Sequence, residues 1–139
     1  MNVLVYTSIW SLALRRKPHD LNPAEKSAVT EFSELNHEGR ARLIGLSRQD
    51  LLSSIKSPQQ FEKLRAALCP FPDEPLDTPD YEAAAQAGNA CHAKGIVVST
   101  VDILICAVAL SHSWSIFSAD PDFQNYAPTL RLKLHSPRK

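Results

Sequence analysis

The sequence is poor in glycine, and this scarcity limits the kinds of site that the chain can build. Only four of the 139 residues are glycine, and none belongs to a glycine-rich loop of the kind that surrounds a phosphate group. A nucleotide-binding or phosphate-accepting α/β domain is therefore disfavoured. The apolar run from Ile103 to Leu110 is far shorter than the roughly 20 residues that a membrane span requires.

The chain also has few cysteines and no net charge. The three cysteines, Cys69, Cys91 and Cys106, lack the spacing of a metal site, so reduced thiols of a cytoplasmic protein are expected. The 15 basic residues balance the 15 acidic ones, so no overall basic field indicates nucleic acid. The N-terminus is apolar before it is basic, the reverse of a secretory signal. We expect one soluble, cytoplasmic domain over residues 1–139, with no membrane partner.

Short apolar runs alternate with helix-start signals along the chain. Helices are expected at residues 9–14, from 23 to about 37, from 47, from 57, at 78–94 and at 99–110. Strands are expected at residues 2–6, 42–46, 115–117 and 130–134, with a short edge strand at 76–77. This alternation predicts a single three-layer α/β/α domain with a mostly parallel central sheet.

Acidic residues follow the predicted strands. Asp102 stands in Ser99-Thr100-Val101-Asp102, a capping box that opens the apolar central helix, while Asp120 and Asp122 follow the strand 115–117. Asp50 ends a second such box, Ser47-Arg48-Gln49-Asp50. Because ligands bind outside the carboxyl ends of parallel strands, these acids are expected to converge on one site.

Clustered carboxylates repel one another unless a hard cation neutralises them. Mg²⁺ or Mn²⁺ takes oxygen ligands and, with bound water, can hydrolyse a phosphodiester. For Asp50 or Asp102 alone, a simple capping role at the positive end of a helix is the better interpretation. Their combination with Asp120 favours a site, whereas a surface-turn role explains Asp122 equally well.

The other polar residues give weaker indications. Ser8 and Ser99 have no Ser/His/Asp context, so we interpret them as helix caps, as we do Thr7. Trp10 is interpreted as a core or interface residue. The histidines have no ligand-like spacing and are expected to be solvated; they are His19, His37, His92, His112 and His135.

Four segments together resemble the PIN-domain ribonucleases, specifically the VapC-type toxins of toxin–antitoxin pairs. They are VLVYTSIWSLALRRK, LIGLSRQDLLSSI, STVDILICAVA and SADPDF, and they occur in the order and at the spacing of that family over nearly the whole chain. The resemblance implies a PIN-like domain, an RNA substrate, a homodimer and a cognate antitoxin partner. It assigns Asp102 and Asp120 to the family's third and fourth acidic positions, with Asp122 beside them, and makes them ligands of Mg²⁺ or Mn²⁺.

The chain departs from the family at two positions. The aspartate that ends the first strand is replaced by Tyr6, ahead of Thr7 and Ser8, and the family glutamate is Asp50, which is one methylene shorter. A phenol titrates near pH ~10 and is neutral at pH 7, so Tyr6 cannot replace a charged metal ligand. We expect a toxin-type endoribonuclease with Asp50, Asp102 and Asp120 as catalytic residues, and with its activity reduced or lost. The alternative is a catalytically inactive homologue, a binding module that sequesters antitoxin.

Overall fold

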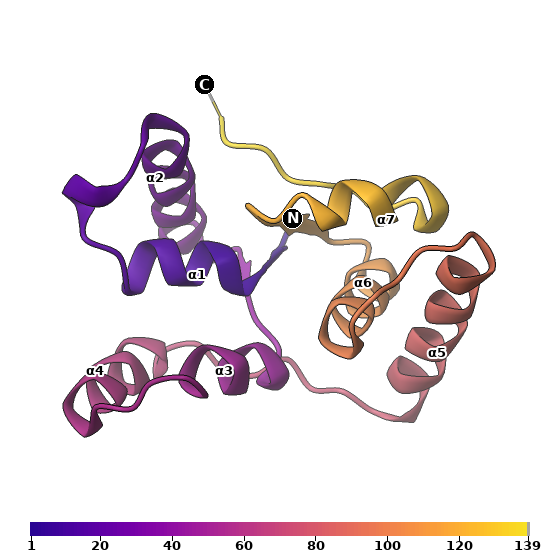
Figure 1. The fold of residues 1–139 in the computed structure, drawn as a ribbon, viewed down its shortest axis with the longest axis horizontal. Coiled ribbons are helices and arrows are strands. Elements are labelled where there is room, and N and C mark those ends of the chain that lie inside the picture. Colours follow the sequence, from indigo (N-terminus) through magenta and orange to yellow (C-terminus); the bar gives the residue numbers. More distant parts are fainter. Residues whose placement is uncertain (139) are drawn as a thin grey trace.

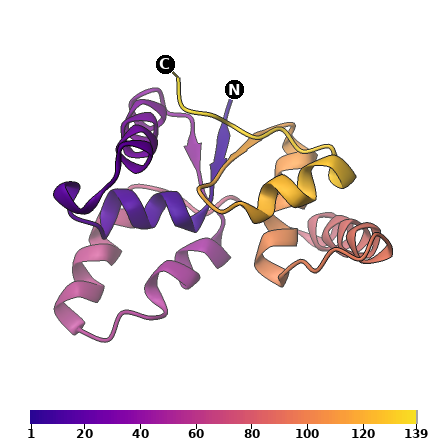
Figure 2. The same ribbon diagram turned by 45° about the horizontal axis from the view of Figure 1, so that its top comes forward.

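The computed structural model describes residues 1–138 and places a small parallel sheet at the centre of the chain. Strands β1 (Val3–Val5), β2 (Ala41–Arg42) and β3 (Ser115–Phe117) pair in the order β2-β1-β3. Both pairings are parallel, and β1 is the central strand. Figures 1 and 2 show helices on both sides of this sheet, which confirms the predicted three-layer α/β architecture.

Alternation along the strands divides the interior into two apolar cores. Val3, Val5 and Phe117 face one side, while Leu4 and Ile116 face the other. The first core lies under α1 (Thr7–Leu14) and α2 (Pro23–His37), with contributions from α3 (Gly45–Leu52) and α4 (Pro58–Leu68). The second lies under α5 (Thr78–Ala93), α6 (Thr100–His112) and α7 (Asp122–Leu130).

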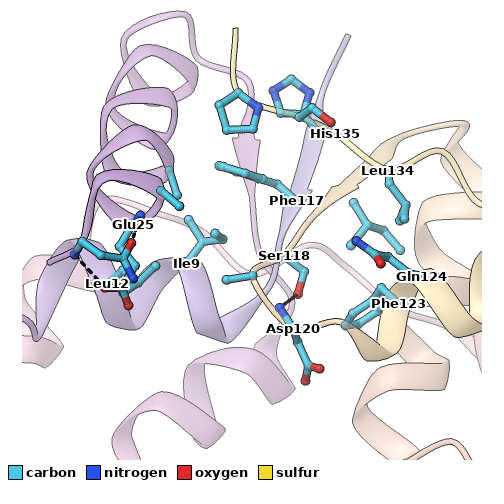
Figure 3. Close-up of a pocket in the computed structure, with 17 residues that line it drawn as sticks. Ile9, Leu12, Glu25, Phe117, Ser118, Asp120, Phe123, Gln124, Leu134 and His135 are labelled. Carbon is cyan, nitrogen blue, oxygen red and sulfur yellow. Dashed lines mark hydrogen bonds between the residues drawn. The ribbon is translucent and has the colours of Figure 1, made fainter. Parts of the chain in front are cut away.

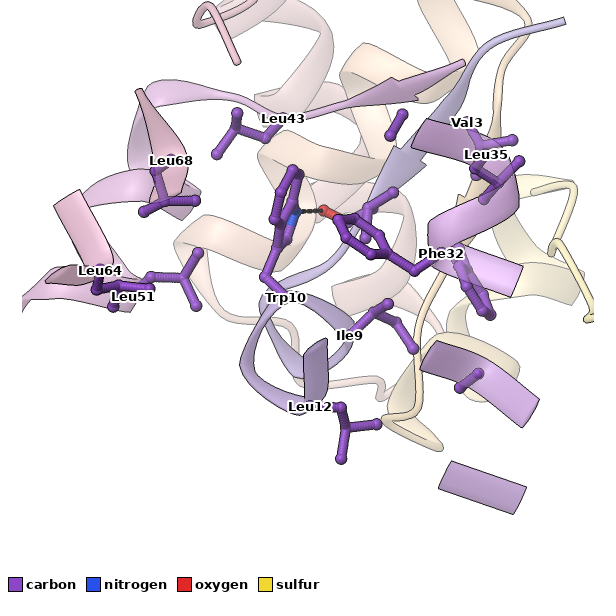
Figure 4. Close-up of a cluster of buried hydrophobic side chains, with 14 of the residues drawn as sticks. Val3, Ile9, Trp10, Leu12, Phe32, Leu35, Leu43, Leu51, Leu64 and Leu68 are labelled. Carbon is purple, nitrogen blue, oxygen red and sulfur yellow. Dashed lines mark hydrogen bonds between the residues drawn. The ribbon is translucent and has the colours of Figure 1, made fainter. Parts of the chain in front are cut away.

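Trp10 is the centre of the first core (Figure 4). Its side chain is fully buried, its indole Nε1 donates to the Val5 carbonyl oxygen at 3.0 Å, and Phe32 and Phe71 pack edge-on against the ring. This arrangement confirms that Trp10 is a core residue. Leu12 is buried as well, so the two side chains do not contribute to an exposed apolar surface.

Helix starts with a side-chain cap lie where the sequence predicts them. Asn22 and Glu25 form a complete capping box at α2, and Ser57 accepts from the Gln60 amide at α4. Gly39 follows α2 with a φ of 70°, a left-handed conformation that glycine adopts readily. These signals are local, which is why sequence alone places them correctly.

Other boundaries differ from the prediction. Helix α3 begins at Gly45 with Ile44 at its N-cap, so the capping box predicted at Ser47 lies inside the helix and does not mark its start. The second strand ends at Arg42 and is therefore shorter than predicted. At α1 the N-cap is Tyr6, so neither Thr7 nor Ser8 caps that helix. Residues 76–77 form no edge strand.

The C-terminal part of the described chain also corrects the prediction. Helix α7 was not predicted, and it contains Pro128. The strand predicted at 130–134 is reduced to a bridge between Leu134 and Ile116, in which the Ile116 amide donates to Lys133 and Ile116 accepts from His135. The last residues therefore run beside β3 as an extended segment. A short helix η1 (Pro18–Asp20) connects α1 to α2.

Candidate functional site

The candidate site lies where β1 and β3 end and where α1 and α6 begin. Tyr6 is the residue between β1 and α1, and Asp102 is in the first turn of α6. The Ser99 hydroxyl accepts from the Asp102 amide at 3.1 Å, so Ser99 is the helix cap that the sequence predicted. The Asp102 carboxylate does not complete a capping box among the described contacts. Its two oxygens point instead to tyrosine hydroxyls.

Asp102 is held between two phenols. The Tyr6 hydroxyl donates to Asp102 Oδ1 at 2.6 Å, and the Tyr126 hydroxyl donates to Asp102 Oδ2 at 3.0 Å. The side chain is almost wholly buried, with 5% exposure. Phe123 packs edge-on against both tyrosine rings, at centroid distances of 4.7 and 5.4 Å. Each carboxylate oxygen therefore has a neutral donor in a rigid aromatic setting.

These contacts keep both phenols protonated at neutral pH. Burial raises the pKa of Tyr6 and of Tyr126 well above the usual tyrosine range, and the hydrogen bond to the Asp102 carboxylate raises each further. A protonated phenol donates one hydrogen bond and carries no charge. Tyr6 and Tyr126 are thus neutral donors at every physiological pH.

The loop after β3 is organised around Asp120. Its amide donates to the Ser118 hydroxyl at 2.9 Å, a contact visible in Figure 3, and its Oδ1 accepts from the Asp122 amide at 2.9 Å. Ser8 accepts from the Ala119 amide at 3.0 Å. Ser8 therefore supports this loop instead of capping α1.

Two cavities meet at this loop. One, of about 410 Å³, is lined by hydroxyl-bearing residues of α1 and by Ser54, which follows α3, together with Arg15. Asp50 and Asp120 lie on its wall beside Tyr6. The other, of about 560 Å³, lies between α1, α2 and α7 and is covered in part by the segment Leu134–Pro137 (Figure 3). Asp120 is the acid that reaches both cavities.

The predicted ligands are not assembled into a metal-binding group. Within residues 1–138, no three His, Cys, Asp or Glu side chains stand close enough to hold an ion. Asp50 is the sixth residue of α3, exposed on its surface, and not in the first turn as predicted. Asp122 is exposed on α7, whereas Asp102 is buried and has a donor on each oxygen. The residues present therefore do not fit Mg²⁺ or Mn²⁺ at this site.

Sequence reasoning missed Tyr126 because it missed α7. The spacing of Phe123, Tyr126 and Leu130 is that of one helix face, and this signal could have placed the tyrosine toward α6. His135 was expected to be solvated, but its ring contacts the buried carboxylate of Glu31. No helix of residues 1–138 has the length and apolar content needed to cross a membrane.

Comparisons with known proteins agree with this architecture. No curated protein sequence matches the chain. Among solved structures, FitAcB from Neisseria gonorrhoeae has a TM-score of 0.75 at 20% identity and covers 97% of each chain. VapBC2 from Rickettsia felis, bound to a DNA fragment from its promoter, has a TM-score of 0.74 at 16% identity and covers 97% of this chain and 98% of the other. FitAB bound to an IR36 DNA fragment has a TM-score of 0.75 at 18% identity, with coverage of 97% and 94%.

The likeness to these structures, all below 25% identity, shows the fold. The family is shown by sequence, since the model of the PIN domain matches residues 3–128. That match contains β1, α6, β3 and nearly all of α7, and so Tyr6, Asp102, Asp120 and Tyr126 of the candidate site. PIN domains are typically metal-dependent nucleases. The chain belongs to the PIN domain family.

Proposed function

We propose that the chain is a toxin-type PIN domain whose ribonuclease centre is silenced at its first acidic position, and that its remaining function is to bind an antitoxin. One observation carries the first part of this proposal. The Tyr6 hydroxyl donates to Asp102 Oδ1 at 2.6 Å. Since the resemblance assigns Tyr6 to the first acidic position, this neutral phenol would stand where the family places a charged ligand.

The loss of that charged ligand should lower the rate of RNA cleavage strongly. In metal-dependent nucleases the ion acidifies water and stabilises charge on the phosphodiester oxygens. Here Asp50 and Asp120 face a shared cavity, but Asp102 is occupied by the two phenols. Losses of several powers of ten are expected, at ~1.4 kcal/mol of barrier for each factor of ten. An RNA strand could still contact Arg15 on the cavity wall without being cut.

A nuclease assay tests the silencing. The purified chain, Tyr6→Asp, and Tyr6→Asp with Asp50→Glu are incubated with labelled RNA and Mn²⁺, each with and without EDTA. The unaltered chain should leave the RNA intact. The single variant should cleave slowly and the double variant faster, with EDTA stopping both, and Asp50, Asp102, Asp120 and Asp122 would then be the acids to mutate next. Equal, EDTA-sensitive cleavage by the unaltered chain and the double variant would contradict the proposal.

The antitoxin part is supported by resemblance. The chain resembles VapC-type toxins in four motifs, and FitAB and VapBC2 are toxin–antitoxin complexes. We expect the product of a short reading frame beside the gene of this chain to form a complex with it when the two are co-expressed. A partner that remains fully separate on size exclusion would contradict this part.

The homodimer is proposed on the same resemblance. Trp10 and Leu12 are in the core and so are not available to an interface, whereas Leu110 is 42% exposed. Light scattering should give twice the 15.4 kDa mass of one chain. A mass of one chain at all concentrations would refute the dimer.

A further inference from the structure

Asp102 is buried with no basic side chain in salt-bridge contact in the described chain, so the stabilisation of its charge requires an explanation. Burying a carboxylate is costly unless hydrogen bonds or opposite charge compensate it. No salt bridge to Asp102 occurs within residues 1–138, and its side-chain oxygens have the Tyr6 and Tyr126 hydroxyls as partners. The two phenols are therefore the groups that stabilise this charge.

The two phenols are also positioned from different directions. Tyr6 comes from the end of β1 and reaches Oδ1, whereas Tyr126 comes from α7 and reaches Oδ2. Phe123 lies against both rings and restricts their movement. We call this arrangement of Tyr6, Asp102, Tyr126 and Phe123 the tyrosine cage. It connects the first strand to two helices on one side of the sheet.

We propose that the tyrosine cage has taken over the structural part of a cation's role, so that Asp102 is a structural acceptor and the fold does not depend on a divalent metal. This inference rests on the proposed function, because it explains how the chain tolerates a silenced centre. Tyr6 replaces the positive partner of Asp102. Tyr126 is a positioning residue, which fixes Oδ2 and thereby directs Oδ1 toward residue 6.

Thermal unfolding tests the cage with conservative variants. Tyr6→Phe and Tyr126→Phe each remove one hydroxyl and keep the ring against Phe123. Because a hydrogen bond to a charged, buried group is among the stronger ones, each should lower the Tm by roughly 4–8 °C. Tyr81→Phe is the matched control, since Tyr81 is 55% exposed, and it should leave the Tm unchanged. Circular dichroism at low temperature verifies that every variant is folded.

The dependence on metal separates the cage from an ordinary pair of hydrogen bonds. The Tm of the unaltered chain should be the same in EDTA and in millimolar MnCl₂. Tyr6→Asp places a second carboxylate beside Asp102, so it should be destabilised in EDTA and recover in Mn²⁺, because a ligand that binds the folded state stabilises it. Calorimetry should show Mn²⁺ bound by Tyr6→Asp and bound about 10–100-fold more weakly when Tyr126→Phe is added.

The proposed role of the tyrosine cage is wrong if Mn²⁺ raises the Tm of the unaltered chain. It is also wrong if Tyr6→Phe and Tyr126→Phe are as stable as Tyr81→Phe. Retained Mn²⁺ affinity in Tyr6→Asp with Tyr126→Phe would overturn the positioning role of Tyr126. These outcomes are independent of the nuclease assay. Cleavage of RNA by the unaltered chain would refute the proposed function and leave the Tm comparison to decide the cage by itself.

Discussion

Two acidic side chains are buried within residues 1–138, and their charges are stabilised in different ways. Glu31 of α2 is 2% exposed and contacts two basic residues of the C-terminal segment, His135 and Arg138, with Arg138 Nε at 2.7 Å from Glu31 Oε1. Asp102, on the other side of the sheet, is 5% exposed and has two tyrosine hydroxyls as its partners. The first acid has a guanidinium and an imidazole as partners, and the second has two neutral phenols.

The two acids differ in whether a basic side chain of the chain itself balances their charge. Burial by itself would raise the pKa of Glu31, but the hydrogen bonds from Arg138 and His135 outweigh it, and the net pKa lies below the usual range. Glu31 is thus a complete internal ion pair, which ties the C-terminal segment to α2. Asp102 has no basic side chain in salt-bridge contact within the described chain, and its two oxygens accept from Tyr6 and Tyr126.

The largest effect should come from removing the two basic side chains that contact Glu31. In His135→Ala with Arg138→Ala, the Glu31 carboxylate remains buried without an opposite charge, which costs about 3 kcal/mol. Glu31→Ala should cost less, because the exposed Arg138 can turn to water. Urea unfolding measures both losses, with Lys133→Ala as an exposed-cation control. Equal losses of unfolding free energy in Glu31→Ala and in the double variant would mean that Glu31 is hydrated in solution and that the comparison with Asp102 fails.

A smaller effect is expected at acidic pH. Since the folded-state pKa of Glu31 is lowered, its contribution to stability is complete above the unfolded value of roughly 4.3 and is lost as the pH falls through the folded value. Glu31→Gln removes this titration. The difference in unfolding free energy between the unaltered chain and the variant, on the order of 1 kcal/mol, should be constant near neutrality and shrink below pH ~4.

Denaturation curves at several pH values check this prediction, and Glu34→Gln is the control, since Glu34 lies on the same helix and is exposed. A difference that grows as the pH falls would have the wrong sign and would mean that Glu31 is protonated in the folded protein.

Sequence predicted the parts of the fold that are encoded locally. Caps such as Asn22 with Glu25, and Ser99 before α6, are short-range hydrogen bonds that residue type and spacing reveal. The start of α3 has no side-chain cap at Ile44, so the sequence carries no comparable signal there. Asp50 was consequently placed in a first turn that it does not occupy.

The contacts of the candidate site were not predictable from the sequence. Motif resemblance put Tyr6 and Asp102 together although 96 positions separate them. The partner of Asp102 Oδ2 could not be found in the same way, because Tyr126 belongs to α7, a helix that contains Pro128 and was not predicted. His135 and Glu31 are 104 positions apart, and neither belongs to a recognised motif. Long-range pairs without a motif depend on the three-dimensional path of the chain, which local pattern does not determine.

The smallest effect should come from salt, and it distinguishes charged partners from neutral ones most directly. Glu38 lies at the exposed end of the Glu31 pair, where hydrogen bonds from Arg138 and Arg40 lower its pKa to about 2. Because both partners are solvated, Glu38→Gln should lower the Tm by less than about 2 °C. At 1 M salt the screening length falls to about 3 Å, and this small loss should vanish.

The loss caused by Tyr6→Phe should persist at 1 M salt, because a neutral hydroxyl donates to Asp102 over a short, buried contact that ions do not screen. Melting curves of the two variants and the unaltered chain, at low and high salt, provide the measurement. A Tyr6→Phe loss that disappears in salt together with the Glu38→Gln loss would mean that Asp102 is solvated, and the contrast between the two buried acids would not hold.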